Sequence, residues 1–182
     1  MPFHTGVFGN GTIYLTPPAD VPNGTRAYVY ILSPDEDPVS FYRRLVLLEP
    51  EDARLYNQLG LAQIEVGKLV DAEASLNRAV QLDFGFAEAH FNLGRCYARQ
   101  GQLDSAQHTY RAAVDLAPEE AATHRQLITV LLLMDDLDAA LAAVTMALQC
   151  VPDLLDWVQH DNALTPLRDD PRWSDALAAA QA

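Results

Sequence analysis

The sequence repeats one pattern of apolar and small residues every 34 positions between residues 53 and 152. Within each period the apolar residues fall three or four positions apart, which places them on one face of an α-helix. Two columns of the repeat hold only alanine, and a third holds a bulky side chain. These columns are Ala72, Ala106 and Ala140; Ala79, Ala113 and Ala147; and Leu76, Tyr110 and Val144. The pattern predicts three stacked pairs of antiparallel helices, over residues 53–86, 87–120 and 121–152.

Glycine occupies two further columns in the first two periods. Gly60 and Gly94 fall inside the first helix of their pairs, where glycine costs about 1 kcal/mol relative to alanine. We therefore expect the second helix of each pair to approach them too closely for a side chain. Gly67 and Gly101 fit the left-handed turn that ends a helix. In the third period neither column holds glycine, so the packing of its two helices is left open.

This 34-residue period resembles the tetratricopeptide repeat. The likeness rests on the alanine columns and on a few leucine, glycine and proline positions, and it extends over residues 53–152 of the 182 residues. Those further positions are Leu59-Gly60 and Leu93-Gly94 in the first helices, and Pro118 and Pro152 at the ends of two units. The resemblance implies a mainly α fold, a right-handed superhelix of about three repeats, and a function in holding other proteins.

Shorter segments flank the repeats. Asp37-Pro38 is typical of a helix start, because an acidic N-cap followed by proline satisfies the first turn, and residues 38–50 fit the second helix of a capping half-repeat. The segment PLRDDPRW, which begins at Pro166, is similar to the tail of many bacterial tetratricopeptide proteins. We therefore expect a helical array over residues 35–152, closed by capping helices over residues 153–182.

Residues 1–34 have a different pattern and predict a small β-hairpin module. Asn10-Gly11 and Asn23-Gly24 are turn signals, and strands should follow each of them. The segment resembles the hairpin modules of AbrB-like regulators and bacterial antitoxins, which commonly pair as homodimers and some of which bind DNA. Arg26 is its only arginine or lysine, so DNA binding is not expected here. An isolated hairpin is marginally stable in water, so it should pack on the helices, pair with a second copy, or both.

The charge balance narrows the range of partners. The chain has 25 acidic and 12 basic residues and a net charge of −13. Nucleic acids and anionic membrane surfaces require a basic footprint, so both are disfavoured, and the acidic excess should form a solvated surface. No apolar run approaches the roughly 20 residues that span a bilayer, and no secretory signal opens the sequence. A cytoplasmic protein is therefore the expectation.

The sequence offers little support for catalysis or metal binding. His90 and His124 share a column, but no ligand partner stands near them at a suitable spacing, so we expect both rings to pack between helices. Cys96 and Cys150 fall at inward positions and should be buried and reduced. No glycine-rich phosphate loop is present. We expect a non-enzymatic protein without a cofactor or a metal.

The resemblance places a partner-binding groove on the concave side of the superhelix, built from first-helix positions outside the packing columns. The residues expected to contact a partner are Arg54, Asn57, Leu61, Phe91, Asn92, Arg95, Arg99, Arg125, Thr129 and Leu132. Arginine recognises carboxylates well, so the expected partner is a protein or peptide segment with acids and an apolar anchor. Arg95, Arg99 and Arg125 are expected to lie close together. The alternative is that the arginines pair with Glu65 and Glu88 or are only solvated.

Some members of this family hold a partner's terminal carboxylate in a clamp of lysine and asparagine from three successive first helices. Asn92 matches the middle position of that clamp. However, Asn57 and Leu61 stand where lysine and asparagine belong in the first unit, and Ala122 and Gln126 stand where lysine and arginine belong in the third. The clamp is therefore not expected in this chain.

Two functions from different classes fit these patterns. The first is an adaptor or scaffold that binds a partner segment in the groove. The second is a self-assembling protein, in which the hairpin module joins two chains as a homodimer and the groove is filled by the chain's own ends. The first helix of the third unit, around residues 127–134, is apolar nearly all round and therefore needs a cover. That cover could be a partner, the C-terminal cap or the N-terminal module.

Overall fold

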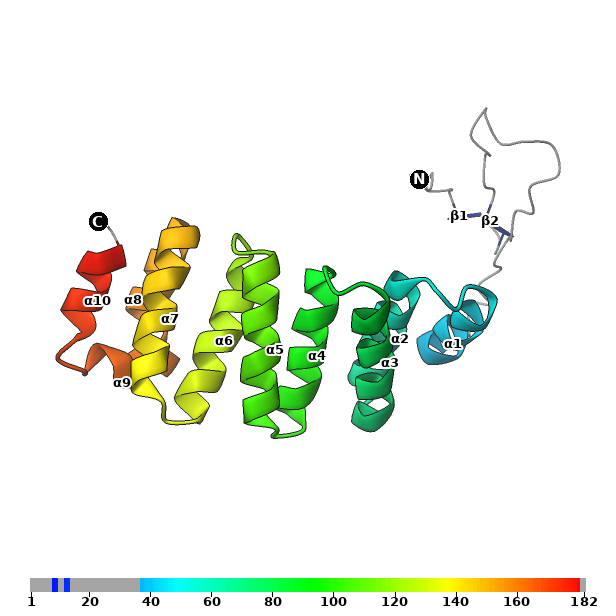
Figure 1. Cartoon of the computed structure of the whole chain (residues 1–182), viewed down its shortest axis with the longest axis horizontal. Coiled ribbons are helices and arrows are strands. Elements are labelled where there is room, and N and C mark those ends of the chain that lie inside the picture. The colour runs from blue at the N-terminus through cyan, green and yellow to red at the C-terminus, as the bar shows by residue number, and fades with distance from the viewer. Residues whose placement is uncertain (1–7, 10–11, 14–36, 181–182) are drawn as a thin grey trace, which may run out of the picture.

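The computed structural model describes residues 8–9, 12–13 and 37–180. Helices α1 to α7 stack side by side in sequence order, and shorter helices close the far end of the stack (Figure 1). The stacked helices are α1 (Pro38–Leu48), α2 (Ala53–Glu65), α3 (Leu69–Leu82), α4 (Ala87–Arg99), α5 (Leu103–Leu116), α6 (Ala121–Leu133) and α7 (Leu137–Cys150). The closing segment contains η1 (Pro152–Leu154), α8 (Leu155–His160), η2 (Asn162–Leu164), α9 (Thr165–Arg168) and α10 (Trp173–Ala180). The predicted array of consecutive helix pairs is confirmed.

Two short strands are described before the helices. Strand β1 (Phe8–Gly9) pairs antiparallel with β2 (Thr12–Ile13), and Phe8 lies opposite Ile13. The rest of the predicted hairpin module, including its second turn and the strand expected after it, lies outside the described residues. The assignment of residues 1–34 to a module therefore stays a prediction.

The first two helix pairs close around a bulky side chain that lies against a glycine. A Cβ atom placed on Gly60 would stand 2.5 Å from Cγ of Leu76, and one placed on Gly94 would stand 2.7 Å from the ring of Tyr110. Carbon atoms do not approach so closely, so a larger residue at either position would displace the Leu76 or Tyr110 side chain or push the two helices apart. The close approach expected from the glycine column is confirmed.

The third pair forms the same succession of helix, left-handed turn and helix with different residues. Ile128 stands in the column of the helix glycine and Val144 in the bulky column, and both are fully buried in the same apolar cluster. At the turn, Asp135 has φ of 59°, against 76° for Gly67 and 75° for Gly101. Aspartate tolerates this left-handed region better than most residues. The third unit therefore keeps the turn without its glycine.

The largest apolar cluster lies between α5, α6, α7 and the closing segment. Four leucine and valine side chains of that segment are almost completely buried in it: Leu154, Val158, Leu164 and Leu167. They join the buried residues of α6, whose apolar sequence needed a cover. Helix α10 packs against α7, where Thr145 Oγ1 donates a hydrogen bond of 3.3 Å to the carbonyl oxygen of Ala176. The chain's own C-terminal segment thus covers this end of the stack.

The N-cap of α1 and the two cysteines test three expectations from the sequence. Asp37 caps α1 by accepting hydrogen bonds of 3.1 Å from the backbone N–H groups of Val39 and Ser40, as expected. Cys96 is buried, and burial raises the pKa of its thiol. Cys150, in contrast, is exposed, so the expectation of a buried residue there was wrong. It is the last residue of α7, where the inward face of the helix ends.

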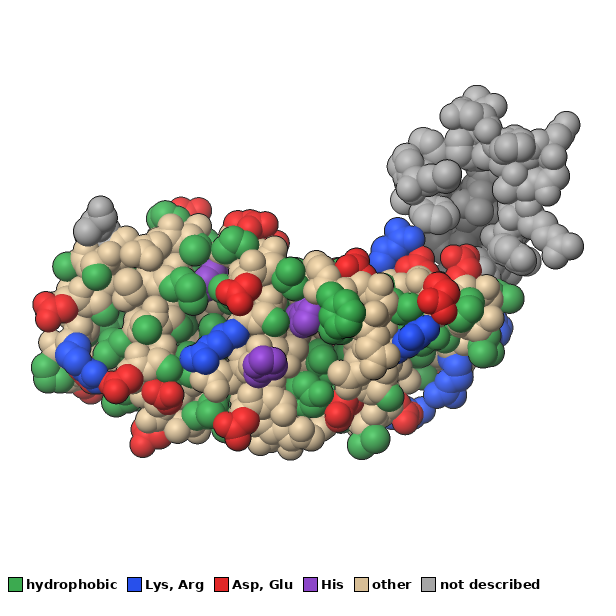
Figure 2. All heavy atoms as spheres, in the orientation of Figure 1, with side chains coloured by type: hydrophobic (Ala, Val, Ile, Leu, Met, Phe, Trp, Pro, Cys, Tyr) green, Lys and Arg blue, Asp and Glu red, His purple; other side chains and the backbone are tan. Residues whose placement is uncertain are grey.

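The surface carries its charges in a dispersed way. On the face shown in Figure 2, acidic side chains are spread along the whole length of the stack rather than gathered in one place. Within the described residues, no helix is both long enough and apolar enough to cross a membrane.

The turn of the third unit generates a stability prediction. Replacing Asp135 by glycine should raise the free energy of unfolding by up to about 1 kcal/mol, because glycine adopts the left-handed region without a steric penalty. The matched control is Gly101→Ala, which should lower it by about the same amount. Thermal melts of both variants provide the measurement. A lower melting temperature for Asp135→Gly would contradict the argument.

The C-terminal cover generates a second prediction. Leu164 is fully buried, so Leu164→Ala should destabilise the fold by about 2–5 kcal/mol, whereas Leu133→Ala, at a leucine that is 66% exposed, should have little effect. Truncation after Pro152 should lower the melting temperature further and promote aggregation. If the truncated chain melted like the full chain, the closing segment would be an independent appendage.

Candidate partner-binding face

The first helices of the three pairs, α2, α4 and α6, form one side of the stack, which we call the A face. It carries the residues expected to contact a partner. The structure places them in three different situations: in a buried network beneath the surface, around two hollows beside α4, and in local contacts elsewhere.

A buried polar network joins α2 to α4. Asn92 Nδ2 donates to Asn57 Oδ1 at 2.9 Å, and Asn57 Nδ2 donates to Glu88 Oε1 at 3.0 Å. Asn57 is 0% exposed and Asn92 is 3% exposed. Both were expected to contact a partner, but neither side chain lies at the surface. Buried amide groups need hydrogen-bond partners, and each asparagine supplies what the other requires. Their role is to fix the two helices relative to each other.

Two arginines of α4 stand above this network. Arg95 donates from Nη1 to Asn92 Oδ1 at 3.2 Å and from Nη2 to Glu65 Oε1 at 3.3 Å. For Arg95, the alternative of pairing with Glu65 is therefore the one present. Arg99 donates from Nη1 to the carbonyl oxygen of Ile64 at 2.9 Å. This carbonyl lies in the last turn of α2 and also accepts a hydrogen bond of 3.1 Å from the backbone N–H of Gly67.

A small hollow opens where these arginines meet α5 and α6. It measures about 250 Å³ and is lined by Arg95, Ala98, Arg99, Tyr110 and Gln126; we call it the basic hollow. The hydroxyl of Tyr110 is buried and has no hydrogen-bond partner among the described residues. Burial raises the pKa of Tyr110 well above its usual value, while the charge of Arg95 acts in the opposite direction. The hydroxyl therefore stays protonated at neutral pH.

A second hollow lies at the other end of α4. It measures about 400 Å³, and its lining combines small residues and one aromatic ring with two acids at its edge: Ala87, Glu88, Phe91, Ala117, Glu120, Ala122 and Thr123. We call it the apolar hollow. The Phe91 ring lies 5.9 Å from the ring of Tyr110, and the Arg95 guanidinium carbon is also 5.9 Å from it. Phe91 thus stands at the boundary between the two hollows.

The remaining predicted residues line neither hollow. The guanidinium of Arg125 lies over the ring of Trp157 in the closing segment, with its carbon 5.1 Å from the ring centre. Leu132 packs on the core cluster, and Thr129 donates to the carbonyl oxygen of Arg125 in its own helix at 2.8 Å. Leu61 is half-buried on α2. Arg125 therefore does not share the hollow of the other two arginines.

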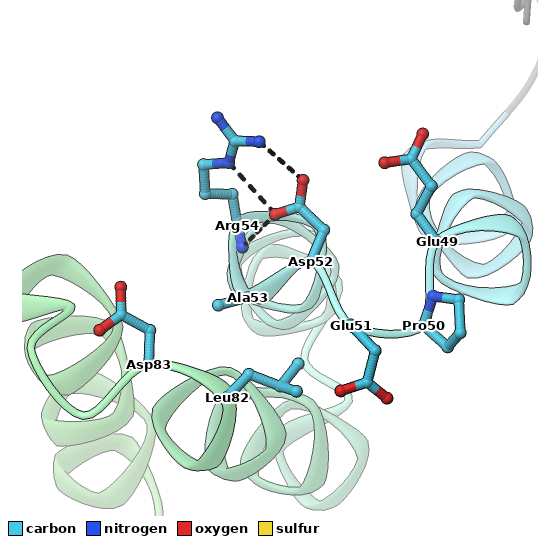
Figure 3. A pocket seen from close by; sticks show the side chains of 8 residues that line it. All are labelled: Glu49, Pro50, Glu51, Asp52, Ala53, Arg54, Leu82 and Asp83. Atoms are coloured by element: carbon cyan, nitrogen blue, oxygen red, sulfur yellow. Dashed lines mark hydrogen bonds and ion pairs between the residues drawn. The ribbon is translucent and has the colours of Figure 1, made fainter. Parts of the chain in front are cut away.

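Arg54 also lies apart, at the junction of α1, α2 and the end of α3. Figure 3 shows it turned back onto Asp52, with Nε donating to Oδ1 at 3.1 Å and Nη2 donating to Oδ2 at 2.8 Å. These hydrogen bonds lower the pKa of Asp52. The surrounding hollow of about 610 Å³ is mostly acidic, since Glu49, Glu51 and Asp83 also line it. The guanidinium of Arg54 is therefore already paired with Asp52, the N-cap residue of α2.

Sequence reasoning did not identify Tyr110 as a functional candidate, because Tyr110 belongs to a packing column. The signal was nevertheless present: the same column holds Leu76 and Val144, which have no polar atom. Tyr110 differs from both in having a hydroxyl group, which has no hydrogen-bond partner among the described residues.

Comparisons with known proteins agree with this architecture. Family models of the tetratricopeptide repeat match residues 53–85 and 87–120, which are the first two helix pairs. A curated relative, the BBSome complex member BBS4 homolog of Drosophila melanogaster, is 33% identical over 129 residues. The match covers 69% of this chain but only 26% of that protein, so the chain spans about a quarter of the relative's length.

Solved structures show the same fold. A crystal structure of MamA superposes with a TM-score of 0.63 at 22% identity, covering 79% of this chain and 86% of that chain. The thermophilic protein TTC0263 of Thermus thermophilus gives 0.57 at 26% identity, covering 77% and 71%. The first such domain of Spaghetti (RPAP3), bound to an HSP90 peptide, gives 0.52 at 20% identity, covering 53% and 77%. With the helix pairs, the glycine contacts and the family matches in agreement, this chain belongs to the tetratricopeptide repeat proteins.

Proposed function

We propose that this protein is a non-enzymatic scaffold that holds an extended segment of a partner protein on its A face. One observation carries the proposal: helix α4 lines two adjoining hollows of different chemistry. Phe91 lines the apolar hollow, and Arg95 and Arg99 line the basic hollow. An apolar anchor fits the first and an acidic side chain fits the second. The partner segment is therefore acidic, with at least one apolar residue.

The charge of the chain makes the two arginines distinctive. In a protein of net charge −13, a hollow lined by two arginines and no acid is a local departure from the general surface. Each guanidinium group has five N–H donors, and the hydrogen bonds described above use one hydrogen on each nitrogen concerned. Donors therefore remain for a carboxylate. Arginine and aromatic residues are also the side chains that contribute most to protein interfaces.

The family supports a role in holding other proteins. Tetratricopeptide repeats typically serve as protein-interaction modules, and the RPAP3 domain has the same fold and is bound to a peptide of HSP90. The proposal extends that general role to this chain and assigns its contacts to the residues around α4. It does not transfer the HSP90 peptide as a partner.

Self-assembly is the second candidate function. Leu47 and Leu48 of α1 are 77% and 52% exposed at the N-terminal end of the stack, where no earlier helix covers them in the described residues. In addition, Trp157 of the closing segment lies over Arg125 of α6, so the chain's own end reaches one of the predicted partner-binding residues. A second copy of the chain packed against this end of the stack would cover the exposed leucines.

The scaffold proposal predicts the outcome of an unbiased peptide selection. Peptides selected from a random displayed library on the full chain should be enriched in Asp or Glu near an apolar residue. The double variant Arg95→Ala, Arg99→Ala should bind them at least about tenfold more weakly, because two charged donors are lost. It should also show a weaker dependence of affinity on salt concentration. Calorimetric titration with the selected peptides provides the measurement.

Arg111→Ala is the matched control, since Arg111 is exposed on α5 and lines neither hollow. Thermal melts accompany both variants, because Arg95 and Arg99 also make contacts within the fold. The proposal is wrong if the selected peptides bind the double variant as tightly as the wild type, or if Arg111→Ala weakens binding more.

Self-assembly predicts a change in oligomeric state. The full chain should sediment as a homodimer at tens of micromolar, and a chain of residues 36–182 should sediment as a monomer, since the proposed joining segment has been removed. Sedimentation equilibrium of both chains is the measurement. A monomeric full chain at this concentration would rule out the homodimer.

A further inference from the structure

Another hollow lies between α3 and α5, the second helices of the first two pairs. It measures about 500 Å³, and α4, which stands between these two helices in the stack, also lines it (Figure 1). We call it the inter-repeat hollow. Its apolar part is formed by Val80, Leu93, Tyr97 and Ala112. None of the residues that the sequence predicted to contact a partner lines it, so it is separate from the site proposed on the A face.

The same columns of the repeat are closed one period later. Three residues that line the hollow are half-buried, whereas the residues in the same columns of the next repeat are at most 2% exposed. The pairs are Val80 and Val114, His90 and His124, and Tyr97 and Leu131. A difference in side-chain size accompanies the opening, because His108 and Thr109 of α5 correspond to two alanines of α7. Smaller side chains let neighbouring helices approach more closely.

The polar side chains around the inter-repeat hollow are not engaged by the fold. Five of them make no hydrogen bond or ion pair with another described residue: Asn77, Tyr97, Asp104, Ser105 and His108. In the hollow beside α1, by contrast, Asp52 and Arg54 are already paired with each other. An apolar surface with a few polar groups around it is the usual composition of a binding site. These groups are free to contact a molecule that enters the hollow.

The charge of the lining indicates what kind of molecule fits. It contains one carboxylate, that of the exposed Asp104 in the first turn of α5, and no arginine or lysine. In a chain of net charge −13, such a place attracts a cation. The third repeat shows this column in use, since Asp138 forms an ion pair with Arg172 of the closing segment. Asp104 has no such cation within the described part of the chain.

We propose that the inter-repeat hollow is a second docking site, which binds a segment of a partner protein through an arginine side chain. The guanidinium donates two hydrogen bonds to the Asp104 carboxylate and lies with its planar face against the Tyr97 ring. Lysine lacks both this plane and the paired donors. An apolar side chain of the same segment covers Val80 and Leu93.

This site goes beyond the proposed function. The A face takes an acidic segment and the inter-repeat hollow takes a basic one, from different sets of residues. The protein therefore holds two segments at once and joins the two proteins to which they belong.

The length of the hollow accommodates two side chains of an extended segment. Along α5 it reaches from Asp104 to Ala112, which corresponds to about 12 Å along the helix axis. In an extended peptide, side chains two residues apart point to the same side and lie about 7 Å apart. An arginine and an apolar residue two positions apart therefore fit within the hollow together.

Short peptides of this design test the site on the full chain. The probe is acetyl-Leu-Ala-Arg-amide, and its neutral match is acetyl-Leu-Ala-citrulline-amide, because citrulline keeps the shape of arginine without its charge. Titrations are followed by NMR through the methyl signals of Val80 and the ring signals of Tyr97. The arginine probe should shift these signals and bind at least about fivefold more tightly than the citrulline probe. This preference should shrink as the salt concentration rises.

Asp104→Asn isolates the carboxylate. The variant should reduce the preference for arginine over citrulline to less than about twofold, because the ion pair is lost. Asp115→Asn is the matched control: Asp115 is exposed on the same helix and lies outside the hollow, so the variant removes the same charge and should keep the preference. This control accounts for the general attraction of an acidic chain for a cation.

Ala112→Met tests the hollow itself, because it gives α5 the residue that α7 has in the same column, Met146. The longer side chain should occupy the hollow and weaken the binding of both probes at least about fivefold. Thermal melts of all variants establish that each remains folded at the temperature of the titrations.

Several outcomes overturn the site. They are equal binding of the two probes to the wild type, an unchanged preference for arginine in Asp104→Asn, undiminished binding to Ala112→Met, and signal shifts that bypass Val80 and Tyr97. The double variant Arg95→Ala, Arg99→Ala should bind the arginine probe like the wild type, so the two sites succeed or fail separately. In the library selection described above, the inter-repeat hollow adds a second class of peptides, which contain arginine in place of an acid.

Discussion

The first two helix pairs of this protein each close on one contact between a glycine and a large side chain. In the first two pairs a glycine of the first helix receives Leu76 or Tyr110 of the second helix, at a distance that no Cβ atom would permit. In the third pair, Ile128 and Val144 occupy these two columns and are both fully buried in one apolar cluster. Because the repeats stack, the separation of the helices in one pair fixes the surface that it offers to the next. The positions of both hollows beside α4 depend on this contact.

The same contact links the packing of the chain to its proposed function. In the middle pair the large residue is Tyr110, which packs on Gly94 and also lines the basic hollow. The network of Asn57 and Asn92 fixes α2 against α4 beneath it, and Arg95 is held from that network and from Glu65. Two arginines with fixed positions lose less conformational entropy on binding than free ones would. The A face is therefore organised before a partner arrives.

The sequence predicted the helices because the columns of the repeat record packing directly. Glycine at positions 60 and 94 and alanine in the two alanine columns predict that neighbouring helices approach closely there. The structure shows this close approach at both glycines and complete or nearly complete burial of the alanines. The roles of the polar residues were harder to predict, because they depend on contacts between repeats. Asn57 was expected at the surface, but its partners Asn92 and Glu88 lie more than thirty positions away in the sequence.

The structure also differs from the sequence-based expectations at the C-terminal end of the stack. Arg125 was expected beside Arg95 and Arg99, but the closing segment folds back and places Trp157 against it. That position follows from how Leu154, Leu164 and Leu167 enter the core, which no repeat pattern encodes. Cys150 is exposed for a related reason, since it lies at the last turn of α7. The N-terminal module of residues 1–34 remains a prediction from turn and strand patterns.

The central claim is that a partner segment lies along α4 with its acid beside Arg95 and Arg99 and its apolar residue beside Phe91. Intermolecular nuclear Overhauser effects between the full chain and a peptide selected on it test this claim most directly. The account predicts contacts from the peptide's apolar side chain to the Phe91 ring, and from the methylene protons of its acid to Arg99 and Gln126. Contacts confined to the side of the stack formed by α3, α5 and α7 would contradict it.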